Sequence, residues 1–170
     1  MIIDAALPLL LEHGEKVTSR QIADAAGIAE GTIFRVFADK DEVIGAVIDA
    51  VLDPEPFEDA LGRIDPNQSL ETVVTAAVQV AQRRVVDAWR LMSSVPPRFH
   101  DRKRRPMLNS PALVRLLLQH RHELAVDPAA AARTLRGLTM AMSHPMIVDE
   151  PATAKTITKQ FLYGVARRDG

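Results

Sequence analysis

Side chains that can pair with the edges of nucleic-acid bases gather between residues 30 and 35 of the sequence. Arg35 can form two parallel hydrogen bonds with guanine, Thr32 can touch the methyl group of thymine, and Glu30 can accept a hydrogen bond from cytosine. These residue types therefore suit recognition of DNA by contact, in which no covalent bond is made or broken.

Two short helices are needed to hold these residues, and the sequence from 18 to 43 predicts a helix-turn-helix. Thr18 is a good N-cap for the first of them, and Gly27 permits a tight turn between two helices that meet at a steep angle. The recognition helix is predicted from about Glu30 to Phe37, with Ile33 facing inward.

Two further helices should enclose this motif. The first covers about Ile2 to Glu12, and Gly14 after it can take the positive φ of a helix end. The other covers about Lys40 to Leu52, with Asp39 as its N-cap and Glu42 completing a capping box.

Several short patterns at fixed spacing carry a family resemblance: a threonine followed by Ile-Ala, then Ala-Gly-Ile, Gly-Thr-Ile-Phe and Phe-x-x-Lys. Together they resemble the TetR family of regulators, from Ile2 to Leu52. The rest of the chain is similar only in its all-helical layout. The resemblance implies an N-terminal domain that binds DNA and a C-terminal domain that binds a small-molecule effector and forms a homodimer.

The resemblance also implies roles for single residues. Thr18 and Lys40 are similar to residues that contact phosphates, and Arg20 to one that reaches a base or a phosphate. Base edges are expected to be contacted from the recognition helix. The full set that we expect at the DNA is Thr18, Ser19, Arg20, Glu30, Gly31, Thr32, Phe34, Arg35 and Lys40.

The chain departs from the family pattern at positions that could otherwise bind DNA phosphates. Phe34 replaces a common tyrosine, Val36 replaces a histidine or tyrosine, and no basic residue precedes Lys16. We therefore expect a DNA affinity that depends less steeply on salt than that of a more basic relative.

Composition is that of an ordinary globular protein, with 47% hydrophobic and 25% charged residues among 170. The net charge of −1 requires any DNA binding to be local. Without cysteine there is no case for disulfides or thiolate metal sites, and a cytoplasmic location is expected. The apolar start lacks the basic residues of a signal peptide, and no stretch has the length of a membrane span.

Two prolines within 53–56 mark the predicted boundary between a DNA-binding domain, residues 1–52, and a helical effector-binding and dimerisation domain, residues 53–170. The fold is predicted to be all-α throughout. The helices expected in the second domain are 57–63, a long one from Asp65 and Pro66 to about 95, then 111–124, 128–144 and 151–167.

A largely apolar effector pocket is expected near the end of the long helix. The residues predicted to line it are Trp89, Met92, Phe99, Leu117, His120, Met140 and His144. The alternative for each of them taken singly is an ordinary place in the core.

The last two helices are expected to pair with those of a second copy as a four-helix bundle, as the resemblance implies. The residues predicted at that interface are Gly137, Leu138, Ala141, Ile157, Phe161 and Gly164. The alternative is that the same face packs within one chain. A dimer suits DNA recognition because two half-sites lie about 34 Å apart.

Nothing in the sequence favours an enzyme, a metal site or a cofactor. It contains no His-Glu-x-x-His, phosphate loop or Gly-x-Ser-x-Gly, and His120 and His122 point to different sides of a helix. The basic segment 98–105 could approach DNA or an acidic ligand, but we expect a solvated loop.

The function predicted is that of a repressor that a small apolar ligand releases from its operator. The alternative is a helical ligand-binding or interaction protein whose N-terminal domain no longer binds DNA.

Overall fold

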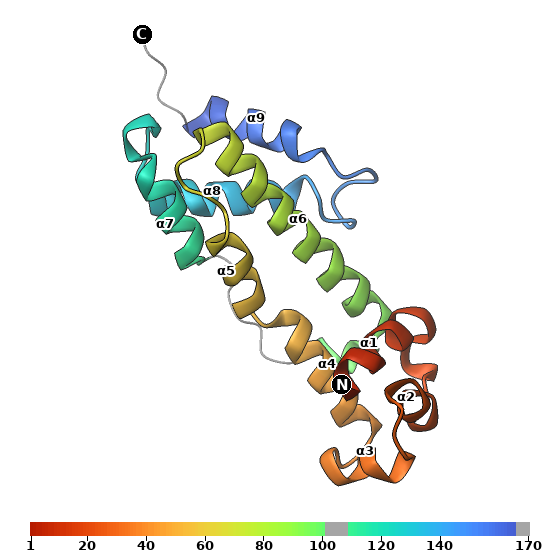
Figure 1. Cartoon of the computed structure of the whole chain (residues 1–170). Helices are drawn as coiled ribbons and strands as arrows, with labels where there is room; N and C mark the ends of the chain where they lie inside the picture. Colours follow the sequence, from red (N-terminus) through yellow and green to blue (C-terminus); the bar gives the residue numbers. More distant parts are fainter. Residues whose placement is uncertain (101–108, 166–170) are drawn as a thin grey trace. The chain divides into compact units, whose positions relative to one another are not determined.

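The computed structural model describes residues 1–100 and 109–165, and within these ranges it is helical with no β-strand, which confirms the all-α prediction (Figure 1). The chain forms two compact units. The N-terminal unit holds residues 1–53 and 87–100, and the C-terminal unit holds 54–86 and 109–165. The long helix α6 (Leu70–Ser94) supplies residues to both.

Short helices make up the N-terminal unit before α6. They are α1 (Ile2–His13), the 3₁₀ turn η1 (Gly14–Lys16), α2 (Ser19–Ala26), α3 (Glu30–Val36) and α4 (Lys40–Leu52). A second 3₁₀ turn, η2 (Pro97–Phe99), follows α6. Asp39 caps α4 as predicted, because its carboxylate accepts from the backbone N–H of Glu42 at 2.8 Å.

The core of the N-terminal unit is closed by the end of α6. Leu10, Ile22 and Ile33 bring one fully buried side chain each from α1, α2 and α3. Leu91 from α6 and Phe99 from η2 pack into the same cluster and are also buried. A buried side chain of this size contributes about 1.5–3 kcal/mol, so the helix-turn-helix depends for its stability on residues far along the chain.

At Gly14 the chain passes close to the end of α6. It ends α1 with a φ of 58°, as the sequence predicts. A Cβ at this position would lie 2.7 Å from the backbone oxygen of Ser94. Glycine is therefore required both by the backbone conformation and by the close approach of another backbone.

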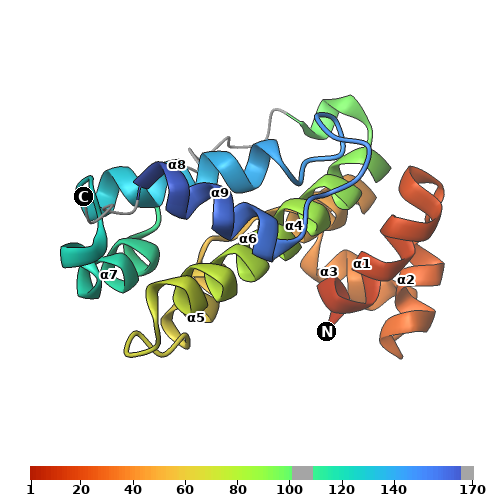
Figure 2. The ribbon, with the colours of Figure 1, turned by 90° about the horizontal axis from the view of Figure 1, so that it is seen from above.

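The C-terminal unit is a helical bundle around its own core. Besides the first part of α6 it contains α5 (Glu55–Gly62), α7 (Pro111–Gln119), the 3₁₀ turn η3 (Arg121–Glu123), α8 (Pro128–Ala141) and α9 (Ala154–Val165). Helix α7 packs on α5 and α8, and α9 lies beside α8 (Figure 2). Within the described residues, no helix is both long and apolar enough to span a bilayer.

Two helices begin later than the sequence suggested. The long helix starts at Leu70, because Ser69 supplies the capping oxygen to Thr72, while Asp65 accepts from Asn67 at 2.9 Å and holds a separate turn. That backbone hydrogen bond is also the main reason why the pKa of Asp65 is lowered. The last helix similarly begins after Thr153, which accepts from the backbone N–H of Thr156.

Two predicted helix ends were also too far along the chain. Helix α7 stops at Gln119, and the 3₁₀ turn η3 follows it, whereas α8 ends at Ala141. The predicted end of the last helix, 167, lies outside the described residues.

Replacing Gly14 tests the contact with α6. Gly14→Ala should lower the free energy of unfolding by about 1–3 kcal/mol for the positive φ and by a similar amount, about 1–3 kcal/mol, for the overpacking against Ser94. The matched control is Gly62→Ala, where a Cβ meets nothing within 4 Å and stability should hold or rise. Urea unfolding followed by circular dichroism measures both, and equal midpoints would contradict the assigned contact.

Candidate DNA-binding surface and effector cavity

Helix α2 begins with a reciprocal cap that fixes its first turn. The Thr18 hydroxyl oxygen accepts from the backbone N–H of Gln21 at 3.2 Å, and the Gln21 side chain accepts from the backbone N–H of Thr18 at 2.9 Å. This capping box satisfies donors that a helix start otherwise leaves unpaired. The N-cap role predicted for Thr18 is therefore observed, while a phosphate contact by it stays a prediction.

The turn between α2 and α3 has the backbone geometry that the sequence suggested. Gly27 takes φ 67° and ψ 32°, the left-handed conformation, and the N–H of Ile28 donates to Ala23 at 3.0 Å. A Cβ at Gly27 would meet nothing within 4 Å, so the backbone conformation alone calls for glycine. Ile33 is the fully buried residue of α3, so the opposite face of this helix is turned to solvent.

The residues predicted to contact DNA fall into two groups. Those that are exposed are Thr18, Arg20, Glu30, Gly31, Phe34 and Arg35. Those that are partly buried are Ser19, Thr32 and Lys40. Helices α2 and α3 thus bring Arg20 and Arg35 to the surface of one motif, and solvent reaches both guanidinium groups.

Ser19 and Glu30 are joined by a hydrogen bond that the sequence did not predict. The Ser19 hydroxyl donates to Oε1 of Glu30 at 2.6 Å and links the start of α2 to the start of α3. The second carboxylate oxygen of Glu30 can still accept from a base. The bond restricts the rotamers of Glu30, which favours contact with a single base position.

Lys40 already has a partner inside the protein. Its Nζ donates to the backbone oxygen of Glu15 at 2.7 Å and so ties the start of α4 to η1. A phosphate contact by Lys40 would have to share or replace this bond.

Arg98, the first residue of the predicted basic loop, makes ion pairs within the N-terminal unit. Its guanidinium donates to both oxygens of Asp41, at 3.2 and 3.3 Å, and to Glu15 at 3.2 Å. The bonds to Asp41 and then Glu15 raise the pKa of Arg98. Residues 101–105 of that loop lie outside the described residues.

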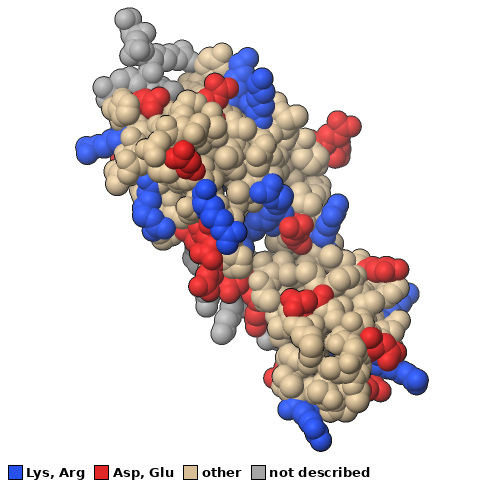
Figure 3. Space-filling model, in the orientation of Figure 1, with Lys and Arg blue, Asp and Glu red and all other residues tan. Residues whose placement is uncertain are grey.

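Acidic side chains outnumber basic ones around the candidate DNA-binding surface. Residues 1–53 contain ten Asp or Glu and four Lys or Arg. Several of these acids make hydrogen bonds or ion pairs within the protein: Asp39 caps α4, Glu42 accepts from the N–H of Ala38, and Asp41 pairs with Arg98. On the face in Figure 3, the two signs are interspersed and form no continuous basic surface.

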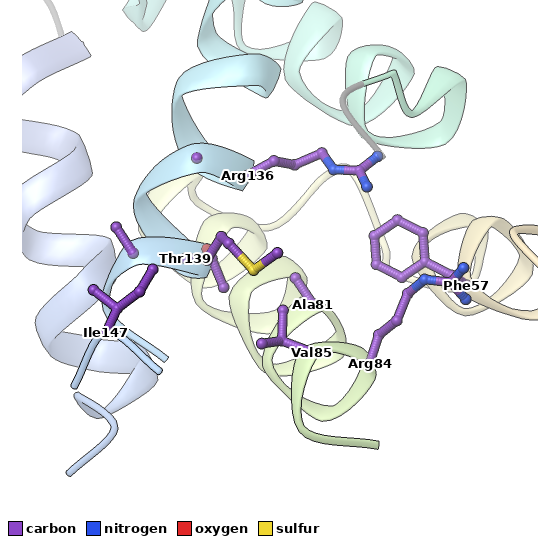
Figure 4. A pocket seen from close by; sticks show the side chains of 10 residues that line it. Phe57, Ala81, Arg84, Val85, Arg136, Thr139 and Ile147 are labelled. Atoms are coloured by element: carbon purple, nitrogen blue, oxygen red, sulfur yellow. The ribbon is translucent and has the colours of Figure 1, made fainter. Parts of the chain in front are cut away.

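A cavity of about 330 Å³ opens in the C-terminal unit (Figure 4). Helices α5, α6 and α8 supply most of its walls. The residues that line it are Phe57, Ala81, Arg84, Val85, Arg136, Gly137, Thr139, Met140, Ala141 and Ile147. The volume is that of a site for a small organic molecule, and most of the lining is aliphatic or aromatic.

Two arginines meet one aromatic ring in this cavity. The Arg84 guanidinium carbon lies 5.4 Å from the centre of the Phe57 ring, and that of Arg136 lies 5.2 Å from it. Figure 4 shows both guanidinium groups directed toward Phe57, one from α6 and one from α8. No local sequence pattern predicts this arrangement, since three separate helices contribute to it.

Of the residues predicted to bind an effector, Met140 lines this cavity. Phe99 is 4% exposed in the N-terminal core, Met92 packs against that core, and Trp89 is half-buried in the same unit. Leu117 belongs to the core of the C-terminal unit. The structure therefore does not bring the predicted set together.

The two predicted histidines are engaged locally. His120 is buried, with Nδ1 2.8 Å from Oε1 of Glu123 and Nε2 3.1 Å from the backbone oxygen of Pro66. His144 is half-buried and accepts from the backbone N–H of Met146 at 3.2 Å. Both ring nitrogens of His120 are thus used in holding its own unit together.

The residues predicted at a dimer interface lie on different faces. Ile157 and Phe161 of α9 are buried in the core of their own chain. Leu138 is partly buried against that core, whereas Gly137, Ala141 and Gly164 are exposed. For Ile157 and Phe161 the structure shows packing within one chain, which the sequence had left as the alternative.

Comparison with known proteins finds a family model that is similar to the N-terminal helices. Residues 2–47 match the model of the bacterial regulatory proteins, tetR family. No curated protein matches the chain.

Solved structures extend the likeness to the whole fold. SmeT, the repressor of the Stenotrophomonas maltophilia multidrug efflux pump SmeDEF, is 24% identical over 99% of this chain and 90% of its own, with a TM-score of 0.58. A complex of SmeT with triclosan is 22% identical over 99% and 91%, with a TM-score of 0.57. NalD, the secondary repressor of the Pseudomonas aeruginosa efflux pump MexAB-OprM, is 20% identical over 98% and 96%, with a TM-score of 0.54.

Gly31 offers a test of the exposed face of α3. A Cβ at Gly31 meets nothing within 4 Å of the protein, so Gly31→Ala should leave the unfolding midpoint unchanged or raise stability by up to about 1 kcal/mol. If this backbone approaches DNA closely, the same methyl group should weaken DNA binding. Thermal unfolding and fluorescence anisotropy with an operator fragment measure the two effects. A variant that binds DNA as well as the parent would place Gly31 away from the groove.

Proposed function

We propose, since residues 2–47 match the model of the tetR family of bacterial regulatory proteins, that this chain is a ligand-responsive transcriptional regulator that binds operator DNA. Helix α3 enters the major groove in this proposal, and α2 lies against the phosphate backbone. The observation that carries it is the exposure of Arg20 and Arg35 on a helix-turn-helix whose turn and core are intact.

Base recognition is assigned to α3 and phosphate contact to α2. Arg35 can pair with guanine, Thr32 can touch a thymine methyl, and Glu30, held by Ser19, can accept from cytosine. Thr18 and Arg20, at the start of α2, contact the phosphate backbone of the DNA. With few cations nearby, we expect a shallow dependence of affinity on salt.

An effector is proposed to bind in the C-terminal unit. The SmeT complex with triclosan is a precedent for a small molecule bound to a protein of this fold. Helix α6 supplies Ala81 and Val85 to the cavity and Leu91 to the N-terminal core. A ligand that favours one arrangement of α6 could therefore alter DNA binding, by a coupling of about 1–3 kcal/mol, if its affinity differs between the two states.

The active form is proposed to be a cytoplasmic homodimer that represses transcription and has no enzymatic activity. Since Ile157 and Phe161 are occupied within their own chain, a second copy would contact the exposed face of α9, where Gly164 lies. Gly137 and Ala141 of α8 are also exposed, but they line the effector cavity and stay open to the ligand in this proposal. Two copies would present two recognition helices to the two halves of an operator.

A second candidate function is that of an effector-binding protein whose N-terminal unit does not bind DNA. It is favoured by the excess of acidic side chains in residues 1–53 and by Phe34 and Val36, which are 49% and 62% exposed. These two apolar side chains stand where the family resemblance implies groups that bond to phosphate.

Anisotropy with fragments from upstream of its own gene, at moderate salt, separates the two functions. The proposed regulator binds one fragment tightly, and Arg35→Ala weakens that specific binding by about 1–3 kcal/mol if Arg35 pairs with a base. The control is Arg63→Ala, an exposed arginine at the end of α5 in the other unit. An equal loss on every fragment would make Arg35 a phosphate contact, and failure of the parent protein on all fragments would favour the second candidate.

A further inference from the structure

The cavity in the C-terminal unit combines an apolar body with two cations. Ala81, Val85, Met140 and Ile147 supply aliphatic surface. The hydroxyl of Thr139 donates to the backbone oxygen of Leu135 at 2.8 Å, so its hydrogen is used within α8. The charged groups among the lining residues are Arg84 and Arg136, and both are positive.

Arg136 is the cation with the most to gain from a ligand. Its side chain is half-buried, and burial is the main cause that lowers its pKa, with the nearby charge of Arg84 adding to it. Glu58 opposes this effect, but its Oε2 also accepts from the backbone N–H of Ala112 at 2.7 Å at the start of α7. Arg84 also interacts with another group of the protein, so Arg136 is the cation on which the test is based.

Phe57 fixes where these two cations point. Each guanidinium lies within 5.4 Å of its ring centre, a distance at which the ring attracts a cation. The ring is itself buried, at 6% exposed, in the core of the C-terminal unit. The cations are therefore held at one end of the cavity by a side chain that cannot easily move.

We propose that the effector of this cavity is an organic anion, a carboxylate or sulfonate on an apolar body, with its acid group bound by Arg136 and Arg84 beside Phe57. This rests on the proposed function only in placing the effector in the C-terminal unit. A planar guanidinium matches a carboxylate with two parallel hydrogen bonds, and such charge-assisted bonds are the stronger kind. A neutral ligand would cover Arg136 without replacing the water that it displaces, which costs free energy.

The test compares two fluorescent probes that share one apolar body. Anilinonaphthalene sulfonate carries an acid group, and phenylnaphthylamine lacks it. Both are titrated into the full-length protein without DNA. Arg136→Met should weaken binding of the sulfonate by about tenfold and change binding of the neutral probe by less than about twofold, because the variant removes charge and keeps apolar volume.

Two further variants serve as controls. Arg136→Lys keeps the charge but loses the planar pair of donors, so it should weaken binding of the sulfonate less than Arg136→Met does. Arg133→Met removes an exposed arginine from the same helix and should leave both probes unaffected. If Arg136→Met does not fold, a salt titration of the parent protein still tests the proposal. Raising KCl from about 50 to about 500 mM should weaken binding of the sulfonate and leave binding of the neutral probe unchanged.

Three results would overturn the proposal. The first is an equal change in both probes on Arg136→Met, and the second is no change in either. The third is exclusion of both probes from a stable dimer, measured by sedimentation, which would show that a second copy covers the cavity. None of these readouts involves DNA, so a protein that binds the sulfonate selectively but no operator fragment would refute the regulator function and leave this inference standing.

Discussion

The helix-turn-helix of this protein depends on the contact between the end of α1 and the end of α6. Gly14 lies so close to the backbone of Ser94 that no side chain fits, and Leu91 and Phe99 fill the core beneath α2 and α3. The four short helices before Asp53 supply most of the buried side chains of this core, and Leu91, Val95 and Phe99 complete it. Small domains bury a low fraction of their surface, so these added side chains contribute to stability. The candidate DNA-binding surface is supported by a helix that begins in the other unit and ends in this core.

This constraint explains how the charges of the N-terminal unit are arranged. Arg98 lies in η2, and its guanidinium pairs with Asp41 on α4 and Glu15 on η1. Lys40 donates to the backbone oxygen of Glu15. Acidic residues that would repel DNA thus serve to hold η1, α4 and η2 together, while Arg20 and Arg35 stay exposed on α2 and α3. Exposed ion pairs contribute little each, so their value here is in positioning.

In the cavity of the C-terminal unit the excess charge is positive. Apolar walls favour an apolar ligand, yet Arg136 is partly withdrawn from water beside a second cation. Such a placement costs stability unless an anion balances it. The aromatic face of Phe57 and the carboxylate of Glu58 offset part of this cost. The cost that these two groups do not offset is the reason why the cavity should prefer a ligand with an acid group.

Local patterns in the sequence were enough to predict the helix-turn-helix. Thr18 as N-cap and the left-handed Gly27 depend on interactions within a few residues, and both are present in the structure. The inward position of Ile33 followed from the apolar pattern of the helix, although distant residues complete the core around it. The start of α6 was misplaced because Asp65 and Ser69 are both good caps, and local preference does not choose between them. The cavity could not be found in this way. Phe57, Arg84 and Arg136 lie on three helices, and only tertiary packing brings their side chains to one place, just as only packing put Phe99 into the N-terminal core.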